Sequence, residues 1–175
     1  MKENRSKIIE VFNYACPGCY DLQQYMFFWK KDNLIMNKKI KNYYLPINLY
    51  NYWFFLSKSY FLSVRLNLIN NFHSNIFYNI HHHNKYEYDV KNIKMYFLEN
   101  NIHPCIFNKT INSRTILKDV KNSQSIKKSF FLSATPSLLI CLPRHILNIN
   151  LDENDYHTTP IINSLDNILK ERYLI

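Results

Sequence analysis

Hydrophobic and polar positions follow two different periods within the first fifty residues. A β-branched and aromatic run at 7–14 is typical of a buried strand, and it contains one acid, Glu10. Apolar residues at three- and four-residue spacings then predict a helix over 20–36, and a second run predicts a strand over 40–49. A strand, a helix and a strand in this order indicate a right-handed βαβ unit.

The middle of the chain carries helical spacing of apolar residues and no strand pattern. The predicted helices cover 51–69, 73–82, 89–100 and 112–128. His103-Pro104 marks the boundary after the third of them, because a residue before proline avoids the helical conformation.

Strand patterns return near the end of the chain. The predicted elements are strands at 137–142 and 146–151, a hairpin at 142–145 and a last helix at 160–173. This order predicts an α/β protein, a thioredoxin-like fold with an inserted all-helical domain. We assign residues 1–50 and 129–175 to the thioredoxin-like domain and residues 51–128 to the insertion.

Composition narrows the class of protein. With 47% hydrophobic residues among 175, the chain is too apolar for intrinsic disorder and long enough to bury a core. Its single glycine, Gly18, excludes collagen-like sequences and glycine-rich nucleotide-binding loops. The formal net charge of +9 comes from scattered lysines without a dense basic block, so we predict no nucleic-acid partner.

The sequence has no obvious membrane-spanning or leader segment. The most apolar stretch, Tyr50 to Leu68, is interrupted by Lys58 and Arg65. Met1 to Lys7 is polar and lacks the apolar run of a signal peptide.

Cys16 and Cys19 form a C-x-x-C pair between the first strand and the first helix. Such a pair is either half of a zinc site or a redox dithiol. A zinc site needs a second pair of ligands, and no second C-x-x-C exists. The N-terminus of a helix favours a thiolate over a thiol, and the thiolate is the nucleophile in disulfide exchange. The position therefore favours redox chemistry, with Pro17 in the first turn of the helix.

Two segments resemble the DsbA family of thiol:disulfide oxidoreductases. Glu10 to Tyr20 reads EVFNYACPGCY, which is similar to the family's active-site segment: an acid six residues before the first cysteine, aromatic residues between, and C-P-x-C-Y. Ser133 to Ile140 reads SATPSLLI, which resembles the family's loop with a cis-proline before a strand. The helical insertion between them agrees in length and position, so the resemblance covers nearly the whole chain.

The resemblance implies a role for each matching residue. Cys16 is the exposed sulfur that attacks and is attacked, and Cys19 is the shielded resolving sulfur. Pro136 is a cis-proline whose flanking backbone lies beside the sulfurs and offers substrate an edge. Glu10 is a buried acid that handles a proton as Cys19 changes state; the alternative is an ordinary glutamate on an edge strand.

The residues around these positions tune the pair. Thr135 stands where many DsbA proteins have valine, and a hydroxyl is commoner there in related isomerases. Gly18 stands where the best-known motif, C-P-H-C, has a histidine that stabilises the thiolate. Because glycine brings no charge, we predict a less oxidising pair than in a C-P-H-C protein.

Several other residues have two possible interpretations. Tyr14 and Tyr20 flank the motif and are candidates for a peptide groove. Cys105 and Cys141 are expected to be buried free thiols, with a second disulfide as the alternative. The histidines at 81–83 are expected to form a solvated helix end or loop, with metal binding as the alternative.

These observations predict an enzyme that exchanges dithiols and disulfides. The resemblance implies donation of the Cys16–Cys19 disulfide to unfolded or reduced exported polypeptides, regeneration by a DsbB-like membrane oxidase, a periplasmic location and no cofactor or metal. We expect a monomer. The alternatives are a disulfide reductase or isomerase on the same fold, and a non-catalytic peptide-binding or chaperone-like module.

Overall fold

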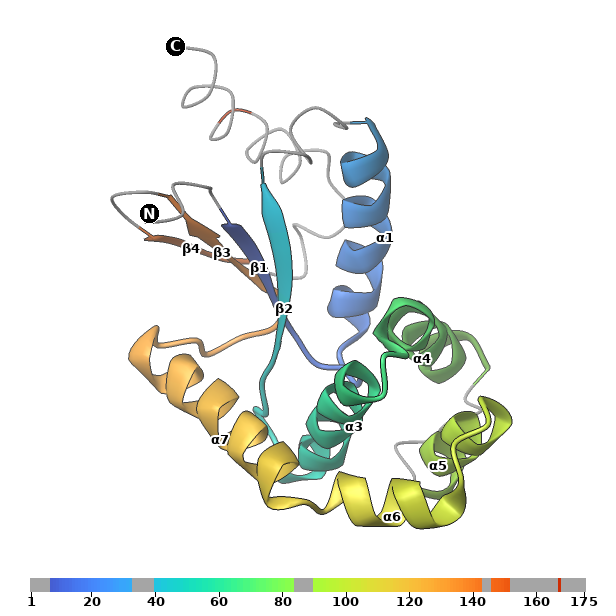
Figure 1. The fold of residues 1–175 in the computed structure, drawn as a ribbon. Helices are drawn as coiled ribbons and strands as arrows, with labels where there is room; N and C mark the ends of the chain where they lie inside the picture. The colour runs from blue at the N-terminus through green and yellow to red at the C-terminus, as the bar shows by residue number, and fades with distance from the viewer. Residues whose placement is uncertain (1–6, 33–39, 84–89, 143–145, 152–166, 168–175) are drawn as a thin grey trace.

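The computed structural model describes residues 7–32, 40–83, 90–142, 146–151 and 167. Four of its elements form one mixed sheet in the order β2-β1-β3-β4 (Figure 1). The strands are β1 Lys7–Phe12, β2 Lys41–Pro46, β3 Ser137–Cys141 and β4 Ile146–Asn150. β1 is parallel to β2 and antiparallel to β3, and β3 is antiparallel to β4. β1 is therefore an inner strand, which explains its nearly continuous apolar sequence.

Helix α1, Pro17–Asp32, joins β1 to the segment before β2 and packs on one face of the sheet. Its side chains Leu22, Met26 and Trp29 form a core with strand residues such as Ile8 and Ile140. Side chains that alternate with these on the same strands point to the opposite face. There Val11, Leu45, Ile47 and Leu139 pack with Leu132, which follows the last helix of the insertion; these residues form a second core.

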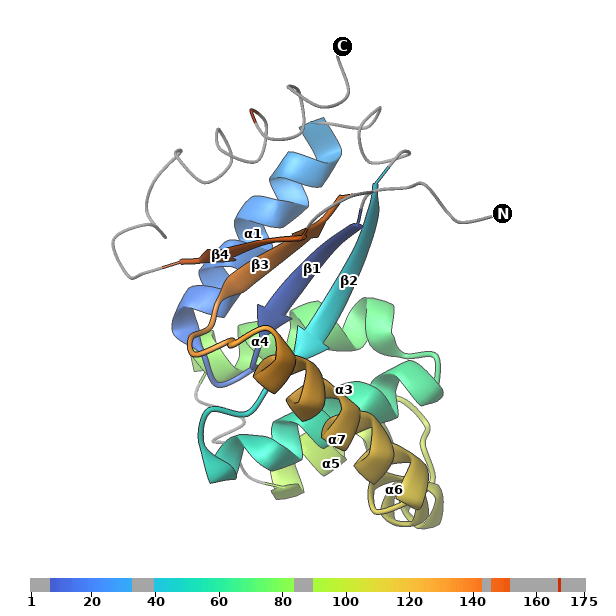
Figure 2. The ribbon, with the colours of Figure 1, turned by 90° about the vertical axis from the view of Figure 1, so that its left-hand side faces the viewer.

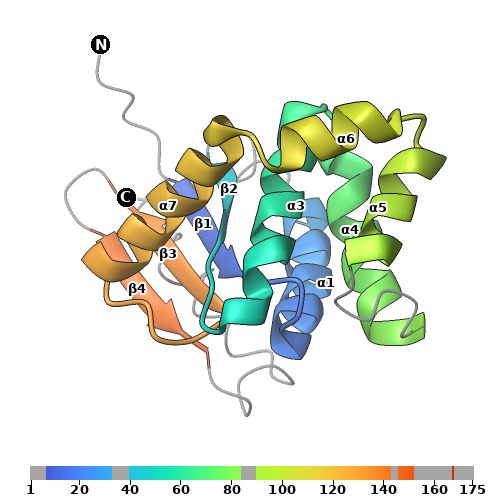
Figure 3. The same cartoon turned by 90° about the horizontal axis from the view of Figure 1, so that it is seen from below.

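The segment between β2 and β3 is helical. It contains η1 Asn51–Trp53, α3 Phe54–Arg65, α4 Ile69–His83, α5 Val90–Glu99, α6 Pro104–Ile111 and α7 Arg114–Ser129. These helices gather at the end of the sheet toward which β1 and β2 point (Figure 2). Seen from below, α7 lies over the strands, apart from the group formed by α4, α5 and α6 (Figure 3).

The helical segment and the sheet share a core. One cluster of buried residues runs from Phe97 and Ile116 in the insertion to Phe12 at the end of β1, and it includes Cys16 and Cys19. The cysteine pair therefore lies where the insertion meets the sheet.

The element order agrees with the sequence prediction, and the boundaries differ where local termination signals act. The helix predicted over 51–69 ends earlier, at Arg65, because Asn67 takes a left-handed conformation with φ of 58°. Helix α6 was not predicted, because its eight residues make only about two turns. Pro104 begins it, and the Nδ1 atom of His103 accepts a hydrogen bond from the Cys105 N–H at 3.2 Å. The predicted hairpin residues 143–145, helix residues 33–36 and all but residue 167 of the last helix lie outside the described residues.

Within the described residues, no helix combines the length and the apolar character needed to cross a membrane.

Candidate active site

The cysteine pair is positioned by a tight turn between β1 and α1. The backbone N–H of Cys16 donates to the carbonyl oxygen of Asn13 at 3.1 Å, which turns the chain out of the strand. The helix begins at Pro17, three residues before the predicted range of 20–36, and Pro17 lies in its first turn as predicted, where a missing N–H is harmless. The N–H groups of Cys19 and Tyr20 donate to the carbonyl oxygen of Cys16 at 3.2 and 3.3 Å, so Cys16 lies at the helix N-terminus and Cys19 in its first turn.

The sulfur of Cys16 lies among hydrogen-bonding groups from two distant parts of the chain. The N–H of Cys19 donates to Cys16 Sγ at 3.2 Å, and the Cys16 thiol donates to the carbonyl oxygen of Thr135 at 3.4 Å. The Thr135–Pro136 peptide bond is cis. The structure thus brings together Cys16, Cys19 and the predicted proline loop, which are separated by more than a hundred residues.

The two thiols differ in acidity. A hydrogen bond with the Cys19 side chain lowers the pKa of the Cys16 thiol. The Thr135 side chain and the N–H groups of Cys19 and Gly18 lower it further, whereas burial raises it. Burial raises the pKa of Cys19 well above its usual value, and the neighbouring Cys16 raises it further. When the pair is reduced, Cys16 is the sulfur that ionises first and Cys19 keeps its proton.

The prediction that Cys16 is exposed is wrong. Only 6% of Cys16 is exposed, compared with 3% of Cys19. The cause is the loop before β3, whose Thr135 carbonyl contacts the sulfur. Cys19 is shielded, as predicted.

Thr135 carries a buried hydroxyl beside both sulfurs. Its Oγ1 atom is inaccessible to solvent and has no hydrogen-bond partner among the described residues. The same side chain lowers the pKa of both cysteines, so its hydroxyl is available to donate to a thiolate when one forms.

Asn13 is a structural residue of the site that the sequence analysis did not single out. Its Oδ1 atom accepts the N–H of Ala15 at 3.1 Å, and its Nδ2 atom donates to the carbonyl oxygen of Ile47 at 3.0 Å. It is buried, and it ties the turn before Cys16 to the chain that leaves β2. An asparagine directly after a strand and before a C-x-x-C pair was the available signal, since asparagine side chains commonly bond to the backbone two residues on.

Glu10 is buried, with 3% of its surface exposed, and it lies on an inner strand, so the edge-strand alternative is wrong. Its register partners are Tyr44 on β2 and Leu138 on β3, which places all three on the face that α1 covers. Burial raises the pKa of Tyr44 and Tyr60, and the charge of Glu10 raises both further. The role of Glu10 in proton transfer stays a prediction.

Tyr14 does not line a peptide groove, because only 1% of it is exposed. Its ring packs against Phe72 and Phe77 of α4, and its hydroxyl forms a 3.0 Å hydrogen bond with Nδ1 of His73. Burial raises the pKa of the phenol well above its usual value. The reason for the failed prediction is the insertion: α4 packs over the turn that carries Tyr14.

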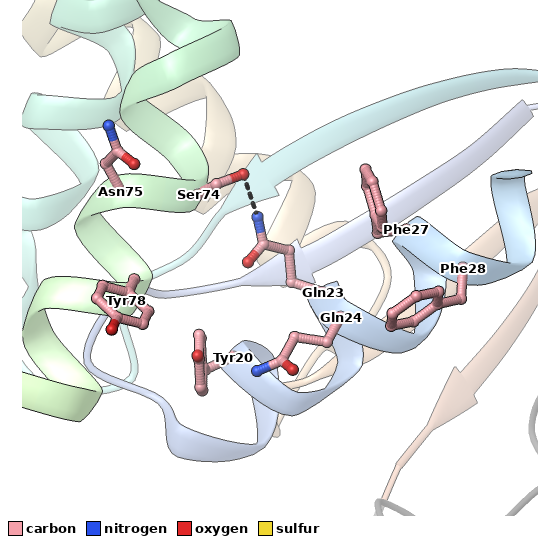
Figure 4. Close-up of a pocket in the computed structure, with 8 residues that line it drawn as sticks. All are labelled: Tyr20, Gln23, Gln24, Phe27, Phe28, Ser74, Asn75 and Tyr78. Carbon is pink, nitrogen blue, oxygen red and sulfur yellow. Dashed lines mark hydrogen bonds between the residues drawn. The ribbon is translucent and has the colours of Figure 1, made fainter.

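Tyr20 is partly exposed and borders a pocket of about 360 Å³ between α1 and α4 (Figure 4). The residues that line it are Tyr20, Gln23, Gln24, Phe27, Phe28, Ser74, Asn75 and Tyr78. The side chain of Gln23 donates to Ser74 Oγ at 2.9 Å and joins the two walls. A role of Tyr20 in binding peptide stays a prediction.

The histidine run closes α4 and His82 is exposed, as predicted for a helix end, but His81 is packed more closely than predicted. The Nε2 atom of His81 donates to the carbonyl oxygen of Tyr14 at 2.9 Å, and its ring stacks on Tyr20 with centroids 5.3 Å apart. Burial lowers the pKa of His81. His81 is therefore partly buried by packing against Tyr14 and Tyr20. No cluster of three potential metal ligands occurs in the part of the chain that the structure describes.

Cys105 and Cys141 are both free thiols. The prediction that both are buried is wrong for Cys105, which is exposed in the first turn of α6. Cys141 ends β3 and is half-buried, and burial raises its pKa.

The sheet order, the cysteine pair at the N-terminus of α1 and the proline loop before β3 define a thioredoxin-like fold with a helical insertion. Neither a protein-family model nor a curated protein sequence matches the chain. Solved structures do. The oxidoreductase DsbA from Xylella fastidiosa aligns with a TM-score of 0.80 at 15% identity, over 98% of this chain and 88% of that one.

Two further structures agree. DsbA from Pseudomonas aeruginosa aligns with a TM-score of 0.77 at 14% identity, over 98% of this chain and 85% of that one. A thioredoxin-like oxidoreductase from Silicibacter pomeroyi aligns with a TM-score of 0.70 at 13% identity, over 96% of this chain and 88% of that one. The chain has the fold of DsbA oxidoreductases, which confirms the predicted fold class.

Proposed function

We propose that this protein is a thiol:disulfide oxidoreductase that oxidises reduced polypeptides with its Cys16–Cys19 disulfide. The observation that carries the proposal is the opposite shift of the two thiol pKa values, lowered for Cys16 and raised for Cys19. A thiol with a lowered pKa is both a better leaving group in exchange and a more stable product of reduction. The structural likeness to DsbA oxidoreductases also supports the proposal of a thiol:disulfide oxidoreductase.

The exchange proceeds in two steps. A substrate thiolate attacks Cys16 Sγ, the Cys16–Cys19 bond breaks, and the electron pair leaves on Cys19, which takes a proton because its pKa is high. A second substrate thiolate then attacks the substrate sulfur of the mixed disulfide, and Cys16 leaves as a thiolate. The substrate loses two electrons to form its disulfide, and the protein gains them as a dithiol.

The groups around the pair have separate tasks in this scheme. The N–H groups at the start of α1 and the Thr135 hydroxyl stabilise the departing Cys16 thiolate. Pro136 and the carbonyl of Thr135 offer a backbone edge beside the sulfur. Glu10 exchanges the Cys19 proton from its buried place on the inner strand.

The test is an oxidation assay with a reduced, unfolded protein as substrate. We expect the unsubstituted, oxidised protein to promote disulfide formation, and both Cys16→Ser and Cys19→Ser to be inactive because neither can form the Cys16–Cys19 disulfide. With a disulfide-bonded peptide as substrate, Cys19→Ser is expected to accumulate a mixed disulfide through Cys16, because the Cys16 thiolate breaks the peptide disulfide and no second thiol of the protein resolves the product. Cys105→Ser, which changes an exposed thiol away from the site, is the matched control and stays active. A Cys16 that reacts no faster than a free thiol at neutral pH would instead support the non-catalytic module.

A reductase or isomerase is the second candidate, and Gly18 favours it because glycine brings no charge to the pair. The reduction potential of the Cys16–Cys19 couple, titrated against glutathione, separates the candidates. A potential near the oxidising values around −120 mV supports the oxidant, and one near −270 mV supports the reductase.

The wider setting follows from the proposed reaction. A protein that donates disulfides works in an oxidising compartment such as the periplasm, since cytosolic thiols are kept reduced. Its reduced form then needs reoxidation by a membrane oxidase of the DsbB type. To test this partner, the protein is expressed in cells with and without such an oxidase, and the redox state of Cys16 is trapped and compared.

A further inference from the structure

Three helices of the insertion end in the same hydrogen-bonded turn. After α3, α5 and α7, one residue takes a left-handed conformation: Asn67 with φ of 58°, Asn101 with φ of 63° and Phe131 with φ of 51°. In α7, the N–H of Phe131 donates to the carbonyl of Lys128 and that of Leu132 to the carbonyl of Lys127. The equivalent pairs of bonds close α3 and α5, so all three ends are Schellman motifs.

Phe131 is the exception among the three. Glycine adopts the left-handed conformation most readily and asparagine comes second, whereas a residue with a bulky side chain is strained in it. Among the described residues, asparagine occupies two of the three such turns. The phenylalanine is 87% exposed, so the fold gains almost no apolar burial in return.

The ring borders a groove at the end of α7. A depression of about 740 Å³ is lined by Leu49, Tyr50, Lys127, Lys128, Phe131, Leu132 and Ser133. Tyr50, another residue of the lining, is also exposed, at 55%. Among the residues that the structure describes, the groove lining presents aromatic rings and two lysines and no acidic residue.

One lining residue of the groove is close along the chain to the active-site loop. Ser133 lies two residues before Thr135, whose carbonyl oxygen is 3.4 Å from Cys16 Sγ (Figure 2 shows the segment that leads from α7 into β3). A polypeptide joined to Cys16 is therefore within a few residues of Phe131. The lining fits an apolar side chain next to a carboxylate, because the rings supply apolar surface and the lysines supply positive charge.

We propose that this groove binds the polypeptide that exchanges with Cys16, through an apolar side chain against Phe131 and Tyr50 and an acidic residue near Lys128. The inference rests on the proposed function and adds to it a substrate preference: reduced segments in which an apolar and an acidic residue lie near the cysteine.

The test compares reduced cysteine peptides as substrates of the oxidised protein. One peptide carries an aromatic residue and a glutamate near its cysteine, a second has lysine for glutamate, and a third has serine for the aromatic residue. Phe131→Asn installs the residue that the chain uses at its other two turns. We expect this variant to lower the rate constant with the first peptide about tenfold, to leave the reaction with glutathione unchanged, and to raise the melting temperature.

The charge is tested separately. Lys128→Glu is expected to slow the glutamate peptide and to speed the lysine peptide, reversing the preference of the unsubstituted protein. Lys121→Glu, an exposed lysine of the same helix outside the groove lining, is the matched control and leaves the preference unchanged.

Each outcome decides one question. A Phe131→Asn protein that is more stable but oxidises all three peptides at the original rates overturns the groove. Vesicles of anionic lipid that bind through Phe131, with unchanged peptide rates, would assign this face to a membrane and also overturn it. If the unsubstituted protein fails to oxidise even glutathione, the proposed function fails. Binding of a serine-for-cysteine peptide, with and without Phe131, then tests the groove by itself.

Discussion

Removing the hydroxyl of Thr135 is the sharpest test of how this site controls its sulfurs. In Thr135→Val the shape is nearly kept, and the buried hydroxyl that lowers the pKa of both cysteines is lost. A hydrogen bond to a charged group is worth about 1.5–3 kcal/mol, and one pKa unit corresponds to about 1.4 kcal/mol. Because the hydroxyl is shared between two sulfurs, we take the lower end and expect the pKa of Cys16 to rise by about one unit.

The assay is the ultraviolet absorbance of the thiolate, followed against pH in the reduced protein. Cys105→Ser and Cys141→Ser in the background remove the other two thiols. Thr135→Ser is the matched control, since it keeps a hydroxyl at the same place, and it retains most of the lowered pKa. An unchanged or lower pKa of Cys16 in the valine variant would refute the argument.

The same change alters the redox balance, with a sign that follows from linkage. Because the pKa of Cys16 is lowered in the folded, reduced protein, its thiolate stabilises that state. This stabilisation is present above the pKa of an unfolded cysteine, about 8.5, and is lost as the pH falls through the pKa of Cys16 in the folded protein. Thr135→Val reduces this contribution, so the dithiol is less stable relative to the disulfide. The couple becomes less oxidising by up to about 30 mV, which the glutathione titration measures.

Three further predictions concern residues around the site. Tyr14→Phe removes the buried bond to His73 and lowers the free energy of unfolding by about 1 kcal/mol; unchanged denaturant unfolding would contradict this. His81 has a lowered pKa, so the stability it contributes is present above about pH 6.5 and is lost as the pH falls through its folded value; His81→Gln, which keeps a donor for the Tyr14 carbonyl, flattens that dependence in acid unfolding. Cys105 reacts with an aromatic disulfide reagent before Cys141, because Cys105 is exposed and burial raises the pKa of Cys141; the reverse order would contradict the structure.

Local sequence determined the elements and the place of the chemistry. The apolar run of β1, the proline at the start of α1 and the C-x-x-C pair all act between neighbours along the chain, so their pattern predicts a dithiol at a helix N-terminus. Pro17 and Cys19 need no distant partner to lie in the first turn.

Only the tertiary structure decided how that dithiol is enclosed. The contact of Cys16 Sγ with the Thr135 carbonyl joins residues more than a hundred positions apart, and it buries a sulfur that sequence reasoning left exposed. Tyr14 is buried for a similar reason, because α4 packs over its ring. Such contacts leave no periodic signal near either residue, since packing depends on which elements meet and periodicity reports only the face that one element buries.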